Sequence, residues 1–145
     1  MVSAQHSPNR WGAVLDELAA DVRRVADRLR GLSAAQLAAP PRPSTQRWPE
    51  YGSRAQAGRA AATELALVAC SLEAAAGSPR EAPDLPKVSD FAVGDQVAVT
   101  GHDLVAAMAR TAPATEVWLG SSQQSTAAEA VSRAARCLAD VRRRI

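Results

Sequence analysis

The feature that most constrains the fold is a stripe of apolar residues near the start of the chain, recurring at steps of three and four. Its members are Trp11, Val14, Leu15, Leu18, Val22, Val25, Leu29 and Leu32. This spacing places all of them on one face of an α-helix. Ser7 and Pro8 precede the stripe as an N-cap and a proline at the first helical position. The pattern predicts a long amphipathic helix whose apolar face packs against other elements.

The composition extends this expectation to the whole chain of 145 residues, a length typical of one domain. Hydrophobic residues make up 47% of the chain, alanine dominates among them, and aromatic residues account for only 3%. Alanine is the best helix former and is poorly suited to strands. We therefore expect an all-α protein with closely approaching helices.

Capping patterns and breakers divide the rest of the chain into helices. Ser33 to Gln36 and Ser53 to Gln56 both have capping-box spacing, and they open a short helix and a helix reaching about residue 76. A third helix is expected over 89–110 and a last one over about 122–143. The proline-rich segments 40–52 and 77–88 connect helices. Residues 111–120 read as a loop whose Val117, Trp118 and Leu119 fold back onto the core.

Together these elements predict a four-helix bundle with one short extra helix and long proline-rich connections. Residues 1–145 form a single helical-bundle domain, in which we expect residues 1–7 to be mobile.

Charge and cysteine content bear on the class of protein. The net charge is only +2, and acids and bases are interleaved along the first helix, as on a solvated helix face. Neither an apolar signal core nor an apolar run of membrane-spanning length is present. We expect a cytoplasmic protein that binds neither nucleic acid nor membranes. Cys70 and Cys137, far apart and among alanines, are expected to be buried free thiols rather than a disulfide or a nucleophile.

The third helix holds the main candidate site. Asp95 and His102 are seven residues apart and share a helix face, with Asp103 beside them and Val97 and Leu104 nearby. We expect this helix to be buried, and buried ionisable groups are costly unless they are paired. One interpretation is a binding or catalytic site, in which a carboxylate orients the histidine. The other is a structural hydrogen-bond network or a half-exposed polar edge.

Gly101 interrupts this segment where a helix-turn-helix motif would turn. The motif is rejected, because Gln96, Thr100 and His102 would then occupy positions that it fills with apolar residues. The basic residues needed for phosphate contact are also lacking over 103–109. Gly101 is instead expected to let a neighbouring helix approach closely.

One face of the second long helix carries Gln56, Arg59 and Thr63. Two interpretations are open: a site for a small anion, or an ordinary polar edge of the helix. A metal site is not expected. The only other histidine is His6, so a site would need His102 with Asp95 and either Glu64 or Glu73. We also expect no cofactor.

Trp48, shortly before the second long helix, and the segment H-D-L-V-A-A at 102–107 resemble the DinB-like and mycothiol-dependent maleylpyruvate isomerase superfamily of bacterial four-helix bundles. Active members of that superfamily hold a divalent metal with three histidines. The position of its helix-two histidine falls on Gln56, its later histidine on His102 followed by Asp103, and a third histidine is missing. The resemblance implies the bundle fold with the metal chemistry lost.

These observations predict a non-catalytic protein that binds a small ligand or a partner near His102, with Asp95, Asp103, Gln56 and Arg59 as further candidate ligand-binding residues. One alternative is a homodimeric interaction module, with Trp48, Tyr51 and Trp118 as interface anchors. Another is a divergent DinB-like enzyme that depends on a metal or a thiol.

Overall fold

The computed structural model describes residues 8–44, 50–75, 84–119 and 123–145, and it is predominantly helical with one small sheet. The order of elements is α1 (Pro8–Arg30), α2 (Ala34–Ala38), α3 (Arg54–Ala75), the 3-10 turn η1 (Asp90–Ala92), α4 (Val93–Ala109), β1 (Glu116–Leu119), β2 (Gln123–Thr126) and α5 (Ala127–Arg144).

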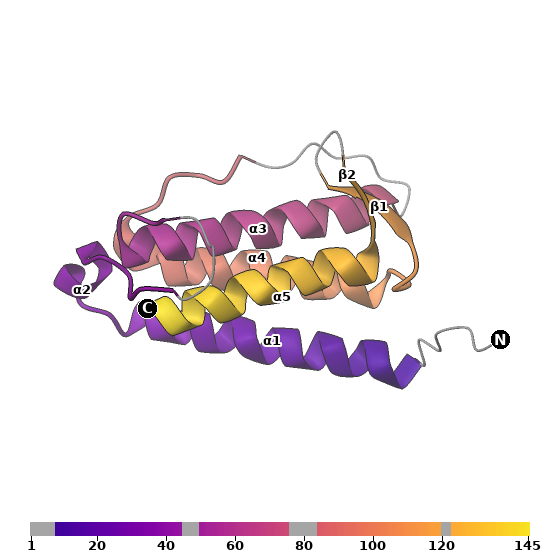
Figure 1. Cartoon of the computed structure of the whole chain (residues 1–145), viewed down its shortest axis with the longest axis horizontal. Coiled ribbons are helices and arrows are strands. Elements are labelled where there is room, and N and C mark those ends of the chain that lie inside the picture. The colour runs from indigo at the N-terminus through magenta and orange to yellow at the C-terminus, as the bar shows by residue number, and fades with distance from the viewer. Residues whose placement is uncertain (1–7, 45–49, 76–83, 120–122) are drawn as a thin grey trace.

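The four long helices lie along the long axis of the molecule, with α2 at one end and the two strands at the other (Figure 1). Helix α4 packs against α1 and α3, and α5 packs against the same two helices from the other side. Each long helix therefore has two long neighbours, and the apolar faces of all four enclose one core.

The core consists of leucine, valine and alanine side chains, as the composition predicts. Leu29, Leu65, Leu104 and Leu138 are fully buried and come one from each long helix. Cys70 and Cys137 are free and buried, which confirms the expectation for the two thiols.

The two predicted capping boxes begin helices at the expected residues. Ser33 caps α2 through its side chain, which accepts from the Gln36 backbone, and the Gln36 side chain accepts from the Ser33 backbone. At α3, the Ser53 hydroxyl accepts from the Gln56 backbone at 3.1 Å, while the Gln56 side chain accepts from Gly52 N at 2.8 Å. In this second box, the Gln56 side chain therefore accepts from Gly52, the residue before Ser53, rather than from Ser53 itself.

The expectation of a loop over residues 111–120 is partly wrong. Residues 116–119 form β1, which pairs antiparallel with β2, with Trp118 opposite Gln124. Val117 and Leu119 face the core as expected, but Trp118 points outward. Because β2 occupies residues 123–126, α5 begins at Ala127 rather than near residue 122.

Several sequence predictions fall outside the described residues: the Ser7 cap, the placement of residues 1–7, His6, Trp48 and the breaker at 77–79. Among the described helices, none is both long enough and apolar enough to span a membrane.

Candidate functional site

The candidate site lies at the contact between α1 and α4, where α4 carries Gly101 against Val22 of α1. A Cβ atom at Gly101 would overlap the Cγ1 atom of Val22 and lie 2.7 Å from its Cγ2 atom. At Gly94, two turns earlier, an added Cβ would lie 2.8 Å from the carbonyl oxygen of Ala26. The two helix backbones therefore approach closely, as the sequence predicts for Gly101.

A groove of about 220 Å³ runs along the surface beside this contact. Most of its lining is small and apolar, and its polar members are Arg23, Arg30 and His102. The lining residues are Ala19, Val22, Arg23, Ala26, Arg30, Ala98, Gly101, His102 and Val105. The short side chains open this groove because they leave the space between the two helices unfilled.

The predicted burial of Asp95, His102 and Asp103 is wrong, since all three side chains are exposed. Their seven-residue spacing does place Asp95 and His102 on the same side of α4. The buried stripe of α4 lies next to them and includes Val97 and Leu104. Asp95, His102 and Asp103 therefore form a solvent-exposed polar edge of α4, so the cost of burying charged side chains does not arise.

Asp95 binds Arg30 rather than His102. Its Oδ1 atom accepts from Arg30 Nε at 2.7 Å, and the Arg30 Nη2 atom lies 2.7 Å from the same oxygen. Arg30 also donates to Asp27 at 3.3 Å. The hydrogen bond to Asp95 raises the pKa of Arg30 above its ordinary value. This pair fixes Arg30 at one end of the groove.

His102 lines the groove, while Asp103 does not. Among the described residues, no hydrogen bond or ion pair joins His102 to Asp95 or to Asp103. The imidazole is therefore available to solvent and to the groove on one edge of α4.

Gln56 and Arg59 lie on α3 and line no part of the groove at His102. Gln56 is engaged in the helix cap described above. The Arg59 guanidinium donates to the backbone oxygen of Val88 and to Asp90, both at 2.8 Å. Arg59 thus holds the connection before α4 against α3. The structure separates Gln56 and Arg59 from the other three candidates.

Metal-ligating side chains do not gather in the described part of the chain. No group of three or more histidine, cysteine, aspartate or glutamate residues there is arranged to hold an ion. Glu64 instead forms an ion pair with Arg133, whose Nε lies 2.5 Å from a carboxylate oxygen. Glu73 lies 4.0 Å from Arg110.

A buried ionic cluster near the end of α5 was not anticipated. Arg144 and Asp140 are both buried, with 3.7 Å between Arg144 Nη1 and Asp140 Oδ2. Arg144 donates to the backbone oxygen of Arg42 at 2.9 Å and stacks over the Tyr51 ring at 5.0 Å, while Asp140 Oδ1 accepts from Ser44 at 3.0 Å. The cluster ties the connection between α2 and α3 to α5. The i, i+4 spacing of Asp140 and Arg144 is the sequence signal that indicates this pair.

Cys137 lies one turn before Asp140, and burial raises the pKa of its thiol to about 12. Because the thiolate is the nucleophile, a thiol that keeps its proton near neutral pH is poorly suited to covalent catalysis.

No family model, curated protein or solved structure matches the chain.

Proposed function

We propose that this protein binds a small organic ligand reversibly in the groove between α1 and α4. The observation that carries the proposal is the concave apolar lining with His102 and two arginines at its rim. Ligand sites are typically concave and apolar, with a few polar groups that fix the orientation of the ligand. Drug-sized molecules occupy pockets of about 300–1,000 Å³, so a groove of about 220 Å³ suits a smaller molecule.

A binding role fits His102 better than a catalytic one. A histidine acting as a general base is usually oriented by a carboxylate on its second ring nitrogen. Asp95 is engaged by Arg30, and the described residues provide His102 with no such partner. A neutral imidazole still offers one donor and one acceptor to a ligand.

The proposal is tested by thermal shift against a library of small metabolites, with the wild type and His102→Ala side by side. A ligand present at 100 times its Kd stabilises the folded state by about 2.7 kcal/mol. We expect His102→Ala to lose most of that gain. Asp103→Ala is the matched control, since Asp103 is an equally exposed neighbour outside the groove. The proposal fails if no compound stabilises the wild type, or if His102→Ala responds as the wild type does.

We further infer that the four long helices constitute a four-helix bundle, supported by the pairing of α1 and α3 with both α4 and α5. A DinB-like origin remains a prediction. Its metal-dependent form is tested by elemental analysis of protein purified without chelator. A stoichiometry near one metal per chain would favour that alternative over simple ligand binding.

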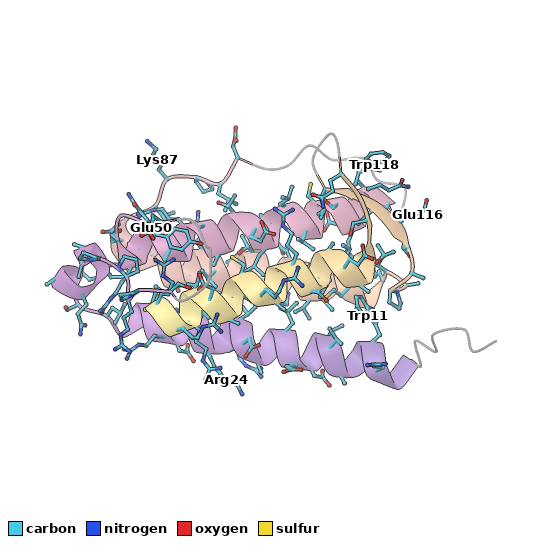
Figure 2. All side chains as sticks on the ribbon, viewed as in Figure 1. Trp11, Arg24, Glu50, Lys87, Glu116 and Trp118 are labelled. Carbon is cyan, nitrogen blue, oxygen red and sulfur yellow. The ribbon has the colours of Figure 1, made fainter. Side chains whose placement is uncertain are left out.

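A second candidate function is self-association through the outer face of α4 and of η1, the turn before it. Phe91 is 64% exposed and Val99 62% exposed, although both are large and apolar. Val99 lines a hollow of about 270 Å³ together with Leu85 and Val88. Exposed apolar patches of this kind often mark protein interfaces. Tyr51, one of the predicted anchors, is instead engaged by Arg144, and Trp118 is 58% exposed on the hairpin at the other end of the molecule (Figure 2).

Light scattering over a range of concentrations tests this second function. We expect a wild-type dimer at high concentration and a monomer for Val99→Asp. Val14→Asp, at an exposed valine of α1, should leave the dimer intact. A wild type that stays monomeric throughout would exclude the homodimer.

A further inference from the structure

We propose that the ligand of the groove between α1 and α4 is a small amphipathic monoanion, with its charge on Arg23 and His102 and its apolar body over Ala19 and Val105. This inference rests on the proposed function, and it adds the chemical class and orientation of the ligand.

The register of the two helices places these groups. Val22 lies against Gly101, and Arg30 pairs with Asp95, so α1 and α4 run antiparallel with known facing positions. Counting two turns along each helix from the Arg30–Asp95 contact puts Arg23 at the level of His102, and both side chains line the groove. About one turn further along, Ala19 and Val105 also line the groove. Arg23 and His102 therefore lie next to the apolar side chains of Ala19 and Val105 within one groove.

The charge of the groove selects an anion. Its lining contains two arginines and a histidine and no acidic residue. Arg30 is engaged by Asp95 and Asp27, whereas Arg23 makes no hydrogen bond or ion pair with any described residue. Asp27 and Asp103 are near in sequence but lie outside the lining. Arg23 is thus the guanidinium available to a ligand, and its planar fork matches a carboxylate in a bidentate geometry.

The rest of the lining limits what accompanies the charge. Ala19, Ala98 and Val105 present only methyl groups, which favour an apolar body over a second polar group. The groove holds only about 220 Å³, which leaves little room for a long chain beside these methyl groups. These features favour a short aryl or branched alkyl carboxylate over a cation, a sugar or a peptide.

The test is a titration of isotope-labelled protein, followed through backbone amide signals of α1 and α4, with phenylacetate, its neutral analogue phenylacetamide, acetate and inorganic phosphate. We expect phenylacetate to bind about 5- to 10-fold more tightly than phenylacetamide, a modest charge effect because the rim is open to solvent. Acetate and phosphate, which lack an apolar body, should bind more weakly than phenylacetate.

Arg23→Ala should reduce the affinity for phenylacetate about 5- to 10-fold and leave that for phenylacetamide unchanged, and Arg23→Lys should restore part of the loss. Arg24→Ala is the matched control. It removes the same charge from the next position of α1, where Arg24 pairs with Asp21 at 2.7 Å and does not line the groove.

Two kinds of failure are distinguishable. If phenylacetamide binds as tightly as phenylacetate, if phosphate equals it, or if Arg23→Ala has no effect, the amphipathic anion is wrong while a groove ligand of another class still stands. If neither these probes nor any library compound shifts the amide signals of the groove, both the ligand class and the proposed function are wrong.

Discussion

Gly101 determines how closely α1 and α4 approach, because any side chain at this position would occupy the volume of Val22. Helix propensity alone favours alanine over glycine by about 1 kcal/mol in a helix interior. The contact with Val22 works in the opposite direction, since a well-packed core resists added methyl groups. The same residue that brings the helices together leaves a groove beside them.

Replacing Gly101 with alanine is therefore expected to destabilise the protein by about 1–3 kcal/mol, despite the better helix propensity. Gly12, also within a helix, provides the control, since nothing lies within 4 Å of an added Cβ there. Gly12→Ala should stabilise by about 0.5–1 kcal/mol. Urea unfolding of the two variants gives both values, and equal signs would contradict the close approach.

The candidate site also shows what residue spacing does and does not determine. The seven-residue interval correctly places Asp95 and His102 on one side of α4. Whether that side faces core or water depends on which neighbouring helix covers it, and here both side chains are exposed. Asp95 therefore pairs with Arg30, which is 65 residues away in the sequence, rather than with His102 as the spacing indicates.

At the scale of elements, the start of α5 depends on a residue that also ends β2. The Thr126 side chain accepts a hydrogen bond from Glu129 N at 3.2 Å and so caps the helix. Four-residue strands with the sequences EVWL and QQST have too little alternation to predict a hairpin. Their pairing depends instead on Val117 and Leu119 reaching the core formed by the helices.

Thr126→Ala is expected to cost about 1 kcal/mol through loss of the N-cap. Ser89 is a suitable comparison, since it occupies the N-cap position of η1 but makes no side-chain capping hydrogen bond. Ser89→Ala should change the stability by less than about 0.5 kcal/mol. Thermal unfolding followed by circular dichroism separates the two, and a larger effect at Ser89 would argue against the assignment of the cap.

For the whole molecule, the important property is that all four long helices contribute to the same core. Trp11 illustrates the connection, since its indole donates to the backbone oxygens of Met108 and Thr111 at 3.2 and 3.1 Å. These hydrogen bonds join the start of α1 to the end of α4 and the residues just after it. A shared core of this size should unfold in one cooperative step.

Leu104→Ala removes a fully buried side chain from α4 and is expected to cost about 2–5 kcal/mol. Because the core is shared, urea transitions followed by circular dichroism and by tryptophan fluorescence should still coincide. Val99→Ala on the same helix, at an exposed position, should stay within about 0.5 kcal/mol of the wild type. Separate transitions for the two probes would show that the helices do not share one core.

Local sequence by itself determined the helices of this protein. Apolar periodicity, alanine content and serine caps act over one or two turns, so α1, α2 and α3 begin where their sequences predict. Only the tertiary structure decided which faces meet. The exposure of His102, the pairing of Asp95 with Arg30, the burial of Arg144 with Asp140 and the hairpin before α5 all depend on contacts between residues far apart in the chain. Such contacts depend on how the helices pack, because the burial of apolar surface between elements, rather than any single segment, brings the partners together.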